Sequence, residues 1–279
     1  MNDATNADAR LDEATLRMIA AEAFDAFNSG GRHVRSFSAR HSGFSLDDAY
    51  RVTAMANALR MARGYIPRGR KIGFTNRTMW SEYNVYAPIW GYVYDRTMHD
   101  LAQPLTLAPY SDPKIEPEIM FGLSTAPAPG MDDLGLLGCI EWISLGYEIV
   151  QSIFTGWKFS PPDTVAADAL HAALLIGQRH AVRGREDEWL HALTTFEIDL
   201  CCDGKLMDHG KATNVMEGPL STLRYTMELL AKDAHNPPLA AGEIISTGTL
   251  TRALPCSAGE TWTTTPSAIA LEGVSVRFA

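Results

Sequence analysis

The sequence predicts an α+β protein in which a helical segment, residues 1–68, precedes a β-rich domain, residues 69–279. Before residue 68, apolar residues recur at the three- and four-residue spacing of amphipathic helices. After it, short β-type runs alternate with Gly, Pro and Asp. No Gly-x-Gly-x-x-Gly follows any of these runs, which argues against a Rossmann-type sheet and favours a mixed sheet.

The helical segment predicts two helices. The first covers about residues 11–27 and stops at the glycine pair Gly30-Gly31. The second begins at Ser45, a good N-cap residue, with acids in its first turn. It ends near Arg63, before another glycine.

The β-rich part predicts strands separated by a few helices. The predicted strands cover residues 71–74, 90–94, 115–123, 140–150, 172–176, 195–201, 243–247 and 274–278. Helices are expected at residues 131–137, 165–170 and 220–232. The run that ends near Leu200 is followed by the turn signal Asp203-Gly204, which predicts a hairpin with Phe196, Ile198 and Leu200 facing inward.

Composition limits the class of protein. The 279 residues suffice for one large domain or a small and a larger one, and 46% hydrophobic and 20% charged residues are usual for a soluble protein. A net charge of -9 argues against nucleic-acid or anionic-membrane partners. The chain shows neither a membrane-length apolar run nor a signal peptide, so a cytoplasmic protein is expected. Four cysteines, none in zinc-binding spacing, are expected to be reduced packing residues.

Two glutamates, Glu116 and Glu118, lie one residue apart in an apolar run. On a strand they share one face, with Cα atoms roughly 6.5 Å apart, close enough for both carboxylates to hold one cation. The same spacing recurs at residues 186–188, in a polar run typical of a solvated loop or helix start. It also recurs at 197–199, on the wet face of the predicted hairpin. The apolar setting distinguishes the first pair.

A third carboxylate, Glu148, is predicted on a strand face beside Ser144 and Gly146, small residues that leave room next to it. Together with Glu116 and Glu118 it would form an all-oxygen site, which suits Mg²⁺ or Mn²⁺ rather than Zn²⁺ or Fe. Such a site leaves coordination positions for water and a bidentate ligand, typically a 2-oxo carboxylate. An exposed strand face is the alternative interpretation of Glu148.

Two further residues could border this site. Lys71 could balance three negative charges, hold a substrate carboxylate or exchange a proton; its alternative is an ordinary surface lysine. His171 precedes an apolar run and could line the pocket; its alternative is a capped or exposed histidine.

The motifs, taken in order, resemble the 2-oxopent-4-enoate hydratase and 4-oxalocrotonate decarboxylase family of the fumarylacetoacetate hydrolase superfamily. The resemblance covers about residues 45 to 279. The motifs that carry it are Lys71–Thr75, Glu116–Ile119, Gly146–Val150, Trp157–Phe159, Asp163–Ala166 and Gly242–Thr251.

The resemblance implies the fumarylacetoacetate hydrolase type of fold and a homo-oligomer. It implies Mg²⁺, or Mn²⁺, on the three glutamates, and Lys71 as a catalytic residue beside the substrate. The loop at 247–251 is expected to close the pocket with backbone N–H groups and a hydroxyl. The substrate-binding residues implied in this way are Phe74, Asp163, Asp168, His171, Thr247, Gly248 and Thr251.

The chain departs from the family pattern at two places. Family members commonly carry an acid after the proline that follows the lysine motif, whereas Pro88 here precedes Ile89. The family's Asp-Asn-Ala-Ser-Ser is replaced at residues 167–171, which introduces Leu170 and His171. Metal chelation should survive these changes, while the far end of the substrate pocket should be reshaped.

The function implied is a Mg²⁺-dependent hydratase acting on a 2-hydroxy-2,4-dienoate or 2-oxo-4-enoate from aromatic-compound catabolism. A decarboxylase of a 4-oxalocrotonate-like diacid is the alternative. An acylpyruvate C–C hydrolase and a non-catalytic partner subunit of an active homologue also stay open. The expected partners are the small 2-oxo acid and further copies of the chain, and a complex with a related pathway enzyme is a further option.

Overall fold

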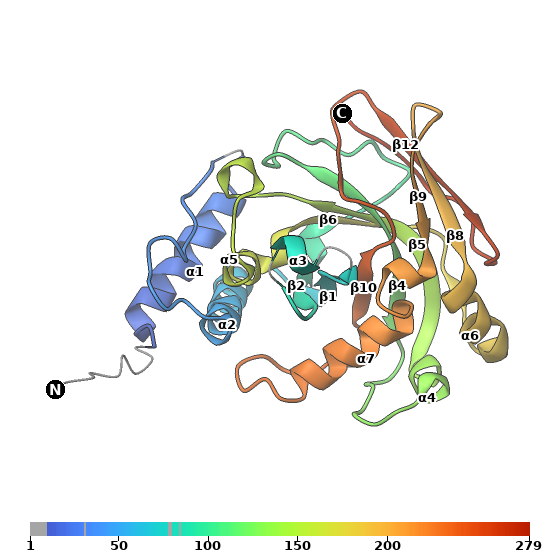
Figure 1. Ribbon diagram of the computed structural model, residues 1–279, viewed down its shortest axis with the longest axis horizontal. Helices are drawn as coiled ribbons and strands as arrows, with labels where there is room; N and C mark the ends of the chain where they lie inside the picture. The colour runs from blue at the N-terminus through green and yellow to red at the C-terminus, as the bar shows by residue number, and fades with distance from the viewer. Residues whose placement is uncertain (1–9, 31, 78–79, 84) are drawn as a thin grey trace.

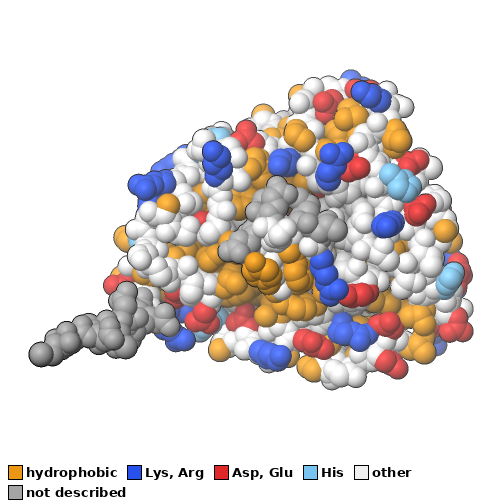
Figure 2. All heavy atoms as spheres, in the orientation of Figure 1, with side chains coloured by type: hydrophobic (Ala, Val, Ile, Leu, Met, Phe, Trp, Pro, Cys, Tyr) orange, Lys and Arg blue, Asp and Glu red, His pale blue; other side chains and the backbone are white. Residues whose placement is uncertain are grey.

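The computed structural model describes residues 10–279 except 31, 78–79 and 84. A strongly curled sheet forms the centre, with one group of helices at the N-terminal end and another along the opposite side (Figure 1). Among the described helices, none is both long and apolar enough to cross a membrane. On the face in Figure 2, Lys and Arg side chains are interspersed with Asp and Glu, in keeping with the absence of basic blocks in the sequence.

Both predicted N-terminal helices are present, with the predicted caps. Helix α1 covers Glu13–Phe27, and α2 covers Leu46–Ala62 with Ser45 and Asp48 forming a capping box. The two helices lie side by side next to α5, Pro161–Ala166 (Figure 1). Their buried faces share an apolar cluster with Ile89 and Val150 of the sheet. The domain boundary at residue 68 stays a prediction.

The larger sheet has the strand order β2-β1-β10-β4-β5-β6-β3. Pairs β1–β10 and β3–β6 are parallel and the others antiparallel, so the sheet is mixed as predicted. The strands are β1 Pro67–Gly73, β2 Ile89–Tyr94, β3 Met98–His99, β4 Lys114–Leu123, β5 Ile140–Val150, β6 His171–Ile176 and β10 Ile244–Thr249. Two short strands extend it: β7 His180–Ala181 pairs with β5, and β11 Leu254–Pro255 pairs with β4.

A second sheet has the order β13-β12-β8-β9. Its strands are β8 Glu197–Cys202, β9 Lys205–Lys211, β12 Thr261–Ser267 and β13 Ser275–Arg277. The predicted hairpin is confirmed: Asp203 and Gly204 both have positive φ, as a type I′ turn requires, and Ile198 and Leu200 are buried. Strands β9 and β12 were not predicted, because they are polar or threonine-rich and contain Gly210 and Pro266.

The remaining helices differ in part from the prediction. Helices α4, Asp133–Gly138, and α7, Pro219–Leu230, occupy predicted positions, and α6, Glu186–Thr195, shows that the 186–188 acids start a helix. The short helix α3 covers Trp80–Tyr83. The helix expected at 165–170 is instead α5, followed by a separate turn at Asp168–Leu170. Two prolines begin α5 and move it toward the N-terminus, because proline favours the first helical turn.

Candidate metal centre and the adjoining cavity

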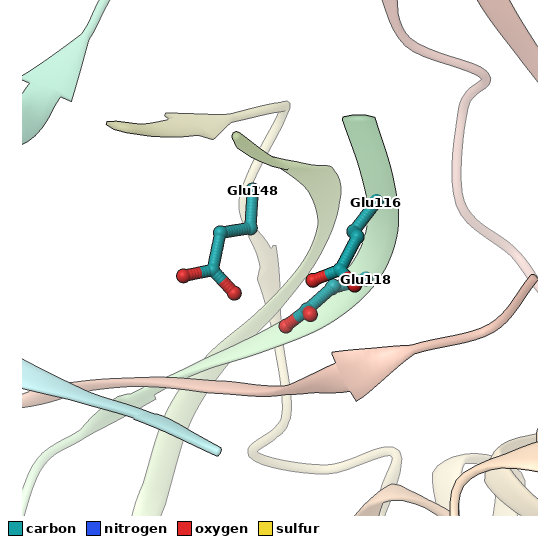
Figure 3. A group of neighbouring side chains, drawn as sticks. All are labelled: Glu116, Glu118 and Glu148. Carbon is teal, nitrogen blue, oxygen red and sulfur yellow. The ribbon is translucent and has the colours of Figure 1, made fainter. Parts of the chain in front are cut away.

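Three glutamates lie close together on the paired strands β4 and β5. In the antiparallel register, Glu116 lies opposite Glu148 and Glu118 lies opposite Gly146. The carboxylate groups of Glu116, Glu118 and Glu148 each offer an oxygen within 4.8 Å of the others (Figure 3). The strand alternation behind the prediction therefore holds for all three residues.

The open space predicted beside Glu148 is not provided by Gly146. A Cβ at Gly146 would lie 2.3 Å from the Leu175 carbonyl oxygen and 2.9 Å from Met120 Sδ. Gly146 therefore permits close packing of β4, β5 and β6 and leaves no open space. The open space is the cavity described below, on the side of Glu116 and Lys71.

The hydrogen bonds of Glu118 leave one oxygen without a partner. Oε2 accepts from the Ser246 hydroxyl at 2.5 Å and from the Gly248 N–H at 2.9 Å. Oε1 is buried and has no hydrogen-bond partner among the described residues. A buried, unsatisfied carboxylate oxygen is costly, and a cation in the cluster would satisfy it. The carboxylates thus fit a divalent ion.

The protonation of the three acids differs. Burial raises the pKa of Glu118 well above its usual range, and Glu148 and Glu116 raise it further. Burial, partly offset by Lys71, raises the pKa of Glu116 to about 7. Burial also disfavours ionised Glu148, but Lys71 and His171 lower its pKa below the usual value. Glu148 is therefore the most acidic of the three carboxyl groups.

Lys71 is a buried partner of this cluster, only 3% exposed, so the surface alternative does not hold. Its Nζ lies 3.0 Å from Glu148 Oε2 and donates to the Ala169 carbonyl oxygen, also at 3.0 Å. Desolvation disfavours the charged amine, yet the three glutamates raise the Lys71 pKa above its usual value. Lys71 thus supplies a fixed positive charge.

The carbonyl that receives Lys71 belongs to a strained turn. Asp168, Ala169 and Leu170 have φ values of 55°, 50° and 64°, although none is glycine. Asp168 holds the turn by accepting from the Tyr92 N–H at 2.8 Å and by pairing with Arg60 of α2 at 3.1 Å. The N-terminal helices therefore help to position Lys71.

His171 contacts Glu148 and does not line the cavity beside Glu116 and Lys71. Its Nδ1 lies 2.8 Å from Glu148 Oε1, and its Nε2 lies 2.8 Å from Thr97 Oγ1. Because ionised Glu148 only accepts, Nδ1 of His171 is the donor in this contact. His171 borders a separate cavity of about 250 Å³, together with Asp168 and Arg60.

A cavity of about 120 Å³ opens beside Glu116 and Lys71. Of the predicted substrate-binding residues, Phe74 lines it. Most of its wall is apolar, and Ile89 and Leu170, which lie at the two departures from the family pattern, are among the lining residues. The remaining apolar part of the wall includes Ile72, Val150, Trp157, Phe159, Ala169 and Ala253.

The other predicted substrate-binding residues lie around the site without lining this cavity. Asp163 caps α5 and accepts from the backbone N–H and hydroxyl groups of Ser38 and Ser160. Thr247 donates its hydroxyl to the Ile119 carbonyl, and the Thr251 hydroxyl donates to the Arg252 carbonyl.

The predicted pocket-closing loop differs from the expectation at two points. Thr247–Thr249 still belong to strand β10, and Thr249 is the member of this segment that lines the cavity. The Gly248 N–H is directed at Glu118. Gly248 has φ 102°, and a Cβ there would lie 2.1 Å from Thr75 Oγ1, so glycine is required.

Sequence reasoning missed Ser246, Thr249 and Lys114. Ser246 hydrogen-bonds Glu118, while Lys114 and Thr249 line the cavity. Lys114 stands two residues before Glu116, the same spacing that separates the two glutamates. Strand alternation could therefore have predicted that Lys114 lies on the same face. Ser246 and Thr249 depend on the pairing of β10 with β4, which no local pattern indicates.

Curated relatives match most of the chain, although no model of a protein family does. The 2-hydroxyhexa-2,4-dienoate hydratase of Comamonas testosteroni is 28% identical, covering 85% of this chain and 88% of the relative. The 2-keto-4-pentenoate hydratase of Paraburkholderia phymatum is 29% identical (77% and 80%). A 4-oxalocrotonate decarboxylase of a Pseudomonas species is 26% identical (74% and 77%).

Solved structures confirm the predicted fold. The 4-oxalocrotonate decarboxylase of Pseudomonas putida G7, solved with magnesium and adipate, has a TM-score of 0.88 at 23% identity and covers 96% of this chain and 99% of its own. The fumarylpyruvate hydrolase of Pseudomonas aeruginosa, solved with Mn²⁺ and pyruvate, has a TM-score of 0.57 at 12% identity, with coverage of 77% and 90%. The fold is of the fumarylacetoacetate hydrolase type.

Proposed function

We propose that this chain, a relative of the 2-keto-4-pentenoate hydratases and 4-oxalocrotonate decarboxylases, is a metal-dependent lyase acting on a 2-hydroxy-2,4-dienoate or 2-oxo-4-enoate. The observation that carries the proposal is the cluster of Glu116, Glu118 and Glu148, two of them buried, at one side of a largely apolar cavity. Lys71 lies 3.0 Å from Glu148 in this cluster. Hydration is the leading reaction.

The proposed cofactor is Mg²⁺, which Mn²⁺ could replace. Glu116, Glu118 and Glu148 would hold it, because hard carboxylate oxygens suit these ions. The partnerless Oε1 of Glu118 supports a cation at this point. When bound, the ion supplies a Lewis acid that chelates the carboxylate and 2-oxo group of the substrate.

The protein's own groups have distinct roles. The Lys71 ammonium stabilises negative charge that develops on the 2-oxygen, because it stays protonated in a buried site. The hydrogen bond from His171 keeps Glu148 ionised and oriented. The largely apolar wall lowers the local dielectric, so these charges act more strongly than they would in water.

Proton transfer needs a group in or near the cavity. Among the described lining residues, Lys71, Lys114 and Glu116 titrate, and Thr75, Thr164 and Thr249 carry hydroxyls. The position that usually holds an acid in this family is Ile89, so protonation of the carbon chain falls to one of these groups or to water.

Decarboxylation of a 4-oxalocrotonate-like acid is the second candidate, because relatives bear both names. The metal cluster would serve either reaction, since both need a stabilised dienolate. The two differ in what happens at the far end of the substrate.

Assays of the purified chain test the proposal. With 2-hydroxypenta-2,4-dienoate and Mg²⁺, we expect loss of the dienol absorbance, abolished by chelator and restored by added Mg²⁺. With 4-oxalocrotonate, CO₂ release would identify the decarboxylase. Failure to convert either acid would contradict the proposal and favour the non-catalytic partner subunit.

A further inference from the structure

We propose that the cavity selects 2-oxo acids whose far end is uncharged and apolar, and that Ile89 and Leu170 are the residues that set this preference. The inference rests on the proposed function, because it assumes that the metal end of the site holds the 2-oxo carboxylate. The substrate class inferred is 2-oxo acids with an alkyl or alkenyl tail, and diacids should bind less tightly.

Ile89 lines the cavity from strand β2. In the antiparallel β1–β2 pair it lies opposite Gly73. A Cβ added at Gly73 would lie 3.4 Å from Ile89 Cγ1 and 3.7 Å from Lys71 Nζ. The bare backbone of Gly73 therefore leaves a space bordered by Ile89 on one side and the ammonium of Lys71 on the other.

Leu170 reaches the same cavity from a different part of the chain. It is the last residue of the left-handed turn whose middle residue, Ala169, accepts from Lys71. Its side chain is 7% exposed and belongs to the apolar cluster that contains Ile89 and Val150. Two apolar residues far apart in the sequence thus line one cavity.

The cations of the described cavity lining already contact other groups of the protein. Among the described lining residues the charged ones are Lys71, Lys114 and Glu116. Lys71 is paired with Glu148. Lys114 stands two residues from Glu116, and its ammonium lies 3.8 Å from the centre of the Trp157 ring. A carboxylate placed against the apolar side chains of Ile89 and Leu170 would lose its hydration and would have to draw Lys71 or Lys114 away from these contacts, which is unfavourable.

Two commercially common acids of equal chain length test the inference directly. 2-Oxopentanoate and 2-oxoglutarate share the chelating end and differ at the far end, methyl against carboxylate. Neither contains the double bond that is hydrated, so calorimetric titration into the Mg²⁺-loaded protein measures binding alone. We expect 2-oxopentanoate to bind roughly tenfold more tightly or better.

The outcomes separate the two proposals. Equal affinity, or tighter binding of 2-oxoglutarate, would overturn the tail preference and leave the proposed function intact. Failure of both acids to bind a protein that does bind Mg²⁺ would overturn the proposed function and the preference together.

A charge variant with a matched control sharpens the test. Leu170→Arg places a cation in the wall and should reverse the order, so that 2-oxoglutarate binds more tightly. Leu170→Met keeps an uncharged side chain of similar length and should retain the wild-type order. An unchanged order in a folded Leu170→Arg protein, checked by circular dichroism, would remove Leu170 from the selecting residues. If that variant does not fold, the comparison of the two acids in the wild-type protein still decides.

Discussion

Glu116 and Glu148 lie directly opposite each other in the antiparallel ladder of β4 and β5. Like charges at facing positions of a sheet are destabilising, and Glu118 adds a third carboxyl group within 4.8 Å. Burial and mutual repulsion raise the pKa of Glu116 and Glu118, so the metal-free protein is strained by its own acids. A bound cation would turn this repulsion into attraction.

The first prediction is that Mg²⁺ stabilises the fold. At a free Mg²⁺ concentration 100 times its dissociation constant, the free energy of unfolding should rise by about 2.7 kcal/mol. Denaturant unfolding with Mg²⁺ and with a chelator measures the difference. An identical free energy of unfolding in the two conditions would contradict a site that forms only in the folded state.

The second prediction concerns the pH dependence of the metal-free protein. The Glu116 pKa, about 7, is above its unfolded value of 4.5, so the folded state binds more protons between these values. Stability from Glu116 is therefore present below about pH 4.5 and lost as the pH rises through 7. Between pH 5 and pH 8 the wild type should lose about 2 kcal/mol relative to Glu116→Gln, which does not titrate there. Parallel stability profiles for the two chelator-treated proteins would contradict this.

The third prediction separates the role of Lys71 from metal binding. Lys71→Met removes the charge but keeps an unbranched side chain. We expect turnover of the dienoate to fall at least about 100-fold, because the charge beside the 2-oxygen is lost. Mg²⁺ affinity, measured by calorimetry, should not fall, because a repelling cation has been removed. Near-normal turnover would refute the catalytic role of Lys71.

The fourth prediction tests the support given by the N-terminal helices. The pair Arg60–Asp168 is buried, with side chains 8% and 5% exposed. Arg60→Leu leaves the Asp168 carboxylate buried without its cation, so the free energy of unfolding should fall by about 3 kcal/mol. Arg40→Leu, which breaks the more exposed pair with Glu22, should cost less than about 1 kcal/mol. Equal losses would show that the buried pair does not hold the turn at 168–170.

Much of the site followed from period-two reasoning. It placed Glu116 and Glu118 on one face, and Glu148 on the face of Ser144 and Gly146, and the ordered motifs gave a resemblance that the curated relatives confirm. Period-two reasoning could not predict the register in which the strands pair. That Glu148 faces Glu116, and that Ser246 reaches Glu118, depends on which strands pair, and pairing is a tertiary property.

The turn at Asp168–Leu170 shows another limit. Left-handed backbone is normally signalled by Gly or Asn, and neither occurs there, so the segment was predicted as helix. Its conformation depends on Arg60 and on the Tyr92 N–H, which lie far away in sequence. His171, which follows this turn, was predicted to line the pocket, but it contacts Glu148 and borders the second cavity instead. The homo-oligomer stays a prediction.

The most direct test of the account is a calorimetric titration of Mg²⁺, repeated with Mn²⁺, into the chelator-treated chain and two variants. We predict one ion per wild-type chain, affinity reduced at least about tenfold in Glu118→Gln, and no change in Glu197→Gln. Glu197 is the matched control, because it also stands one residue from a second acid on a strand, Asp199, but its side chain is 52% exposed. The same affinity in Glu118→Gln and the wild type would contradict the three-glutamate metal centre.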